Sequence, residues 1–142
     1  MSGFWRNWLT VWCWAVGVFG AVLVGGGLEA TSGPARLIFG ILDGPEPLDL
    51  NAQMRFSLAV MGAVTIGWAV TAAATIQAAI LLGERAAPVW RGLVAGVLVW
   101  FVIDTPMSIA TGYGMNAIPN LILLATFLLP IIRSGVLRAS PT

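Results

Sequence analysis

The sequence contains no histidine and no lysine, and its single cysteine is Cys13. Without histidine the chain has no imidazole to ligate haem or a transition metal, and no histidine to act as a general base. One cysteine cannot form an internal disulfide. The basic residues are all arginines, and the net charge of +1 leaves no basic patch for nucleic acid. These absences exclude histidine-dependent enzymes and metal sites, an internal disulfide, and a nucleic-acid interface.

Charged residues of either sign are scarce. They make up 9% of the chain, against about 25% in a typical soluble domain, whereas 58% of the residues are apolar. A surface that faces water needs more charge than this chain supplies. The composition therefore predicts an integral membrane protein.

Four apolar segments are long enough, or nearly so, to cross the hydrocarbon layer, which takes roughly 20 residues in a helix. They run over 8–28, 54–82, 89–111 and 117–132. The first is longer than the roughly 7–15 apolar residues of a signal peptide and has no clean cleavage site after it, so we predict a retained span. We expect an all-α protein with one domain over 1–142, a four-helix transmembrane bundle.

Arginine placement predicts the orientation of this bundle. If the chain crosses four times, one side carries Arg6, Arg85, Arg91, Arg133 and Arg138. Arg36 and Arg55 fall on the other side, together with most of the acidic residues. Because cytoplasmic loops of membrane proteins are enriched in arginine and lysine, both termini are predicted to be cytoplasmic. In the first outer loop, Ser32-Gly33-Pro34 resembles a helix start, and we expect a short interfacial helix that ends before Gly44.

Small residues at helical spacing predict where the helices approach one another, because membrane helices associate through close backbone contact. The candidate seams are Ala63, Gly67, Thr71, Ala74 and Ala78 in the second span, Gly92 and Gly96 in the third, and Gly17, Gly20 and Gly25 to Gly27 in the first. We favour contacts inside the bundle, with a dimer interface as the alternative.

Tryptophan is concentrated at the start of the first span, where Trp5, Trp8, Trp12 and Trp14 lie close together. Tryptophan prefers the membrane interface, so anchoring in lipid explains Trp5 and Trp8. Trp12 and Trp14 lie about 6–9 Å deeper at 1.5 Å per residue. Contact with a partner protein, a pigment or a quinone-like tail is the alternative for these two.

Asp104 is the only carboxylate inside a predicted span, about 22 Å along the third helix. An acid at this depth costs about 2.5–3.5 kcal/mol on insertion scales and needs a partner. Ser108 lies one turn further along, and the short outer turn brings Asn116 and Asn120 near it. We expect Arg55 to supply the positive charge.

Four further polar residues are expected at the rim of this cluster: Thr111, Tyr113, Gln53 and Ser57. Two interpretations stay open. The cluster is either a polar clasp that fixes helix register, or an outward-facing cavity for a polar ligand, a cation or a proton. We expect no metal site and no bound cofactor.

The third and fourth spans carry the pattern Asp-Thr-x-x-Ser-x-x-x-Gly-x-x-x-Asn-x-x-x-Asn from Asp104 to Asn120. This pattern resembles a family of small four-span bacterial membrane proteins of uncharacterised function. The resemblance implies a multi-pass protein of the bacterial inner membrane and assigns no activity. It therefore transfers no catalytic residue to this chain.

Three functional hypotheses follow. We favour a non-enzymatic accessory or scaffold subunit that packs in the lipid bilayer against a larger respiratory or photosynthetic complex, or forms a homo-oligomer. The second hypothesis is a small transporter, channel or sensor that uses the polar residues around Asp104. The third, a membrane enzyme, has little support, because no nucleophile and base lie at a suitable spacing.

Overall fold

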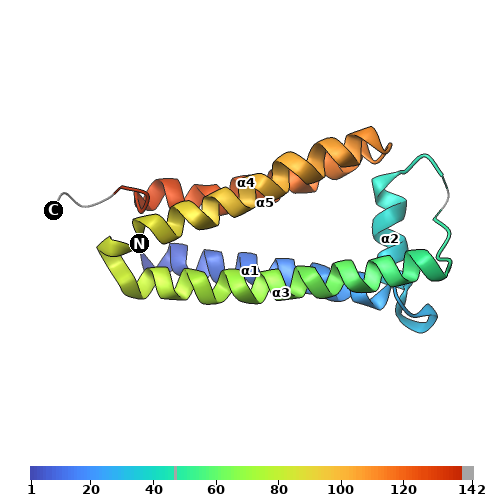
Figure 1. Cartoon of the computed structure of the whole chain (residues 1–142), viewed down its shortest axis with the longest axis horizontal. Helices are drawn as coiled ribbons and strands as arrows, with labels where there is room; N and C mark the ends of the chain where they lie inside the picture. The colour runs from blue at the N-terminus through green and yellow to red at the C-terminus, as the bar shows by residue number, and fades with distance from the viewer. Residues whose placement is uncertain (47, 139–142) are drawn as a thin grey trace.

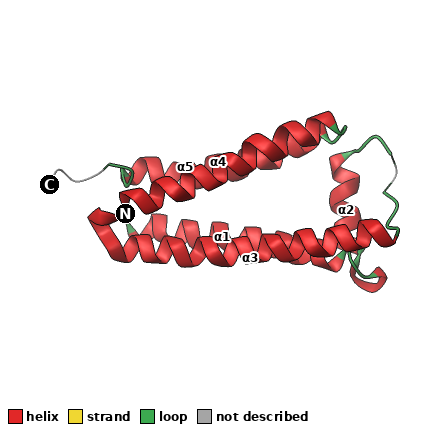
Figure 2. Ribbon diagram, viewed as in Figure 1, coloured by secondary structure: helices red, strands yellow, loops and turns green. Residues whose placement is uncertain are grey.

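The computed structural model describes residues 1–46 and 48–138, and over these ranges the chain is helical, with no strand. The predicted domain over 1–142 thus includes residues outside the described ranges. The α-helices are α1 (Gly3–Gly25), α2 (Gly33–Leu42), α3 (Ala52–Leu82), α4 (Ala87–Ala110) and α5 (Ala117–Ser134). Short 3₁₀ turns connect them: η1 (Glu29–Thr31), η2 (Gly83–Ala86) and η3 (Gly114–Asn116). Figure 2 shows that loops occupy the connections between helices, of which the one between α2 and α3 is long.

Three continuous helical stretches are long and apolar enough to cross a membrane: Gly3–Gly25, Ala52–Ala110 and Gly114–Ser134. The middle stretch folds back on itself at η2, so α3 and α4 run in opposite directions (Figure 1). The helix ends lie close to the predicted ones. The main difference is in the first span, where the α-helix begins at Gly3 and ends at Gly25, ahead of two further glycines.

The long helices are arranged as two antiparallel pairs (Figure 1). α1 packs chiefly on α3, and α4 packs chiefly on α5. The pairs lie close together at the end that holds the N-terminus and η2, and they diverge toward the other end, where α2 stands across the molecule (Figure 1). We call these the η2 end and the α2 end.

Gly20 of α1 and Gly62 of α3 form a very close backbone contact within the first pair. A Cβ atom added at Gly62 would lie 2.5 Å from the backbone oxygen of Gly20 and 2.5 Å from the backbone nitrogen of Val24. Only glycine permits this approach of two backbones. Gly26 and Gly27 are also tightly surrounded, by side chains that include Leu58 and Ala59.

The contacts inside the bundle that we favoured for the seam on the second span are wrong, whereas the alternative of a dimer interface stays a prediction. The seam members Ala63, Gly67, Thr71, Ala74 and Ala78 are all exposed. The buried face of α3 is a neighbouring one, formed by Leu58, Gly62, Ala69, Ala72, Ile76 and Ala79. Gly92 and Gly96 do not form a close seam either, because a Cβ at either position would meet nothing within 4 Å. Small residues of α3 occur on all sides of the helix, so their spacing could not identify the face that packs on α1.

The tryptophans of α1 are divided between the interior and the surface. Trp12 is 5% exposed, and its indole Nε1 donates a hydrogen bond to the Leu123 carbonyl at 3.0 Å. Trp8 is partly buried, and its Nε1 donates to the Thr126 carbonyl at 2.8 Å. Trp12 therefore does not lie on the outer surface of the bundle, so the predictions that it anchors in the surrounding lipid or contacts a partner protein there are wrong. Trp14, in contrast, is 71% exposed.

The predicted short helix after the first span is present as α2. Pro34 lies in its first turn, and Asp43 follows it with a left-handed φ of 48°. Ser32 and Ala35 are buried, whereas Leu37 and Ile41 on α2 are exposed. α2 therefore covers the α2 end of the first pair on one face and presents apolar side chains on the other.

Candidate functional site

The α4–α5 hairpin has a very short turn, which brings two polar stretches of sequence together. Gly112 adopts a φ of +87°, a backbone conformation that residues other than glycine rarely adopt. The backbone nitrogen of Tyr113 donates to the Ser108 carbonyl at 2.8 Å, which closes the end of α4. α5 then starts directly after Asn116. Its first two turns lie beside the last two turns of α4.

Asp104 is the centre of the polar cluster in this hairpin. Its Oδ2 atom accepts a hydrogen bond from Asn116 Nδ2 at 3.1 Å and one from Asn120 Nδ2 at 2.5 Å. Asn116 Nδ2 also lies 2.9 Å from Ser108 Oγ, and Asn120 Nδ2 lies 3.0 Å from Thr105 Oγ1. Asn120 is 4% exposed, and the other members are partly buried.

The spacing explains why these residues meet. Asp104 and Ser108 are four residues apart on α4. Asn116 precedes α5 with helical backbone angles, and Asn120 follows four residues later, so each pair occupies one face. The two faces are antiparallel and adjacent. A polar side chain in hydrocarbon finds no water to bind, so hydrogen bonds between the two faces replace those that water would make. These hydrogen bonds link α5 to α4, and we call the cluster the clasp.

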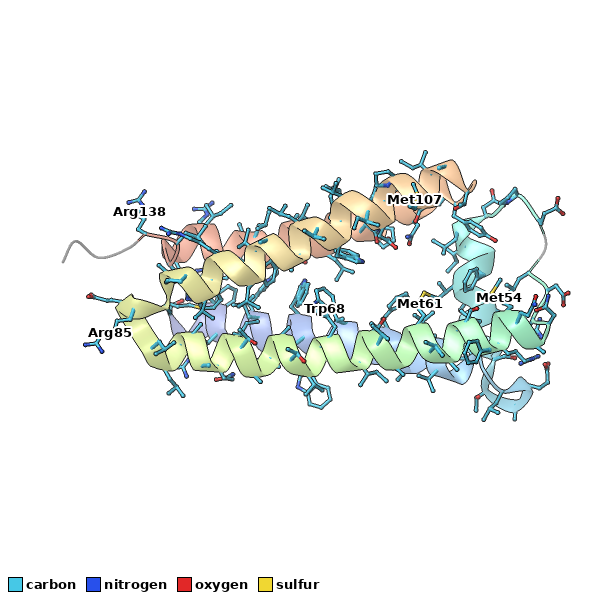
Figure 3. All side chains as sticks on the ribbon, in the orientation of Figure 1. Met54, Met61, Trp68, Arg85, Met107 and Arg138 are labelled. Atoms are coloured by element: carbon cyan, nitrogen blue, oxygen red, sulfur yellow. The ribbon has the colours of Figure 1, made fainter. Side chains whose placement is uncertain are left out.

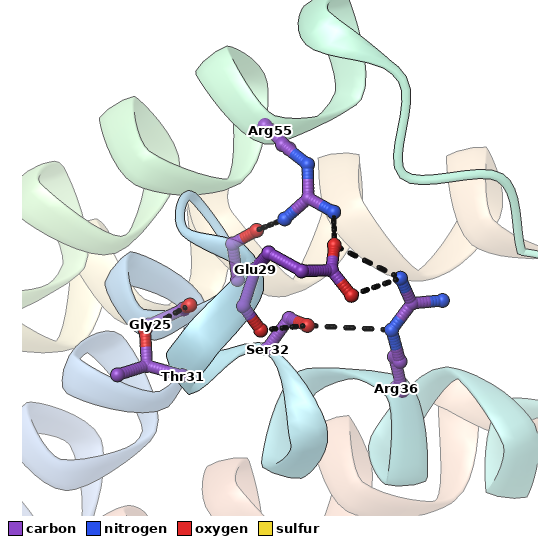
Figure 4. Close-up of polar contacts among 7 residues, drawn as sticks. Gly25, Glu29, Thr31, Ser32, Arg36 and Arg55 are labelled. Atoms are coloured by element: carbon purple, nitrogen blue, oxygen red, sulfur yellow. Dashed lines mark hydrogen bonds and ion pairs between the residues drawn. The ribbon is translucent and has the colours of Figure 1, made fainter.

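Arg55 is not part of this cluster. Its guanidinium binds the Glu29 carboxylate and lies 3.4 Å from the Gly26 carbonyl (Figure 4). Arg36 binds the same carboxylate at 3.4 Å. The predicted pairing of Arg55 with Asp104 is therefore wrong. Glu29 lies at the end of α1 and Arg55 near the start of α3, so the packing of α1 on α3 brings them together.

The rim residues have other roles. Thr111 Oγ1 lies 2.8 Å from the Met107 carbonyl oxygen, so this hydroxyl binds the backbone at the end of α4 and not the cluster. The Tyr113 ring packs edge-on against Phe39 of α2, with centroids 6.1 Å apart, and contacts Gly44. Gln53 and Ser57 are exposed on α3. Tyr113 thereby joins the hairpin turn to α2.

Thr105 belongs to the cluster, although we did not predict it as a site residue. Its hydroxyl oxygen contacts the same amide that binds Asp104. In the sequence, the feature that could have predicted this role is the position of Thr105 next to Asp104 in the polar stretch of the third span. Among the described residues, no group of three or more cysteine, aspartate or glutamate side chains is placed to hold a metal ion.

A double-mutant cycle tests the clasp. Asp104→Ala and Asn120→Ala are each expected to lower the free energy of unfolding, with a coupling of about 1–1.7 kcal/mol, at the upper end of values measured for hydrogen bonds between membrane helices. The measurement is denaturant unfolding in mixed micelles. Asp104→Ala with Arg55→Ala is the control cycle, and it should be additive. Additivity in both cycles would argue against the clasp.

Over the described residues the chain is all-helical, with helices long and apolar enough to cross a membrane, which is the class of a helical membrane protein. No family model, curated protein or solved structure matches the chain. The likeness of the α4–α5 hairpin to small four-span bacterial proteins stays a prediction.

Proposed function

We propose that this chain is a non-enzymatic accessory subunit that packs against a larger complex of the bacterial inner membrane. The observation that carries the proposal is the placement of Trp14. It projects from α1 with 71% of its surface exposed, within a helix long and apolar enough to cross a membrane. Lipid anchoring puts tryptophan at the membrane interface. Trp14 lies about 16 Å from the start of α1 at 1.5 Å per residue, deeper than anchoring requires.

Trp14 is part of an exposed apolar face on α1. Phe4, Val11 and Val18 are 64%, 67% and 58% exposed, and their spacing of seven residues places them on one side of the helix with Trp14. An aromatic side chain buries about 150–250 Å² on contact and is a frequent anchor of interfaces. This face is the partner surface in our proposal.

In this proposal α1, α3, α4 and α5 each cross the bilayer, and both termini are cytoplasmic. The support is the arginine distribution. Arg85 and Arg138 lie at the η2 end (Figure 3), as do the ends of the helices that carry Arg6, Arg91 and Arg133. Arg36 and Arg55 lie at the α2 end, near the acidic loop. The positive-inside rule then assigns the η2 end to the cytoplasm.

The alternative function is a small transporter, channel or sensor that uses Asp104. Its support is the intramembrane carboxylate itself, since such groups often mark ion or substrate pathways. The geometry favours the structural role instead. Two asparagine amides already donate to Asp104 Oδ2, and they come from the neighbouring helix.

Affinity purification from native membranes in lipid nanodiscs tests the proposal. Wild-type chain should co-purify with a stoichiometric protein partner, and Trp14→Ala should lose that partner while its thermal unfolding stays unchanged. Phe56→Ala is the matched control, because Phe56 is 70% exposed on α3 and lies outside the proposed face. A partner retained by Trp14→Ala would overturn the proposed surface. A homo-oligomer without other proteins, whose ion or solute flux is abolished by Asp104→Asn, would establish the alternative.

A further inference from the structure

A cavity of about 280 Å³ lies between the two helix pairs, in the half of the molecule nearer the η2 end. All four long helices contribute to its wall. The lining includes Trp12 of α1, Trp68 of α3, Gly92, Gly96 and Val97 of α4, and Phe127 of α5. Figure 3 shows Trp68 pointing from α3 toward the α4–α5 pair. The cavity is separate from the Asp104 clasp, which lies toward the other end of α4.

Two glycines form the accessible side of this cavity. Gly92 and Gly96 are four residues apart on one face of α4, and both are exposed. A Cβ atom added at either glycine would meet nothing within 4 Å. The missing side chains therefore leave open space along this part of α4, beside the cavity and on the exposed side of the helix.

Two polar side chains in the wall are hydrogen-bonded to backbone carbonyls, and the Trp68 indole N–H is a single donor with no hydrogen bond to the described residues. Trp12 Nε1 donates to the Leu123 carbonyl at 3.0 Å, and the Thr75 hydroxyl lies 2.7 Å from the Thr71 carbonyl oxygen. Water in a cavity needs two to four polar partners, and cavities lined by apolar groups stay dry. The occupant must therefore be apolar.

The size and shape of the cavity restrict the occupant further. Pockets for drug-sized molecules usually have volumes of about 300–1,000 Å³, so this cavity, at about 280 Å³, lies at the lower end of that range and suits a slender occupant. A helix, about 10 Å across with its side chains, is too wide to enter. The rings of Trp12 and Trp68 are held edge to face, with centroids 5.8 Å apart, which gives the cavity a rigid aromatic end.

We propose that this cavity binds one hydrocarbon chain of a membrane lipid, which enters past Gly92 and Gly96. Helices that span a membrane are surrounded by acyl chains, and these are slender, apolar and flexible enough to fit. The headgroup of the bound lipid stays outside, so the site selects the chain and not the headgroup. The inference holds whether or not the chain is an accessory subunit.

Plugging the cavity tests this proposal without unfolding the protein. In Gly92→Leu/Gly96→Leu the new side chains enter open space, and replacing glycine inside a helix is favourable by roughly 0.5–1 kcal/mol for alanine or leucine. Gly67→Leu is the matched control, because Gly67 is exposed on α3, has nothing within 4 Å of an added Cβ, and does not line the cavity. Equal or higher thermal stability of all variants establishes that they are folded.

The first readout is native mass spectrometry of the full chain with added phosphatidylglycerol or phosphatidylethanolamine. Wild type and Gly67→Leu should retain one lipid more than the plugged variant, with either headgroup. The second readout uses lipids brominated on the acyl chain, which quench tryptophan fluorescence on contact. Quenching should fall in the plugged variant, and most of that difference should disappear when Trp68→Phe is added to both proteins.

Three outcomes would overturn the proposal. Equal lipid retention and equal quenching in wild type and the plugged variant would show that no chain occupies the cavity. Strong preference for one headgroup would place the recognition outside the apolar cavity. Stoichiometric co-extraction of a ring-bearing isoprenoid, lost in the plugged variant, would replace the acyl chain by another ligand.

Discussion

Trp12→Ala is expected to lower the free energy of unfolding by about 3 kcal/mol, the lower end of the range for removing a large aromatic side chain from a protein core. Trp12 makes three contacts with two other helices, α3 and α5, through its ring and its N–H. Its ring centroid lies 5.8 Å from that of Trp68 and 5.0 Å from that of Phe127, and its N–H binds the Leu123 carbonyl. Alanine would remove all three contacts. We expect the lower end of this range of unfolding free energies because helices that separate on unfolding remain in contact with lipid.

Thermal unfolding in lipid nanodiscs, followed by circular dichroism, measures this effect. Trp14→Ala is the matched control, because it removes the same side chain two residues away from an exposed position. It should change the stability of the isolated chain by less than about 0.5 kcal/mol. A similar loss in both variants would contradict the inward orientation of Trp12.

Gly62→Leu is expected to separate α1 from α3, with a loss of about 3 kcal/mol or failure to accumulate. The first carbon of any side chain at Gly62 would overlap the backbone of α1, at the Gly20 oxygen and the Val24 nitrogen. Overpacking typically costs about 1–3 kcal/mol, and the cost is highest where the neighbour is backbone that cannot rotate away. The whole α1–α3 contact must therefore shift.

Expression level and melting temperature in detergent compare this variant with Gly67→Leu, which adds the same side chain one turn and a half away on the exposed face of α3. Gly67→Leu should accumulate normally. Normal stability of Gly62→Leu would show that α1 and α3 do not approach through these glycines.

The helices follow from the sequence alone. With 9% charged residues and long apolar runs, the chain can satisfy its backbone polar groups in hydrocarbon only by forming helices. Glycine, proline and polar residues between the runs then determine where the helices end. The short helix at Gly33–Leu42 follows in the same way from Pro34 and from an apolar stretch too short to cross.

The clasp could also be predicted, because its geometry is local. Asp104 with Ser108, and Asn116 with Asn120, obey helical spacing, and the turn between the helices is too short for the two faces to separate. Only two adjacent helices and one turn are involved. No knowledge of the other helices is needed.

The partners that come from distant parts of the chain were decided by the tertiary structure. Arg55 pairs with Glu29, 26 residues earlier, because α1 and α3 pack together at Gly20 and Gly62. Trp12 points inward because α5 lies beside α1 and offers a carbonyl acceptor at Leu123. Periodicity places a residue on a helix face, but in an apolar solvent several faces of a helix are equally acceptable to lipid. The choice among them depends on where two backbones can approach most closely, and that depends on both helices at once.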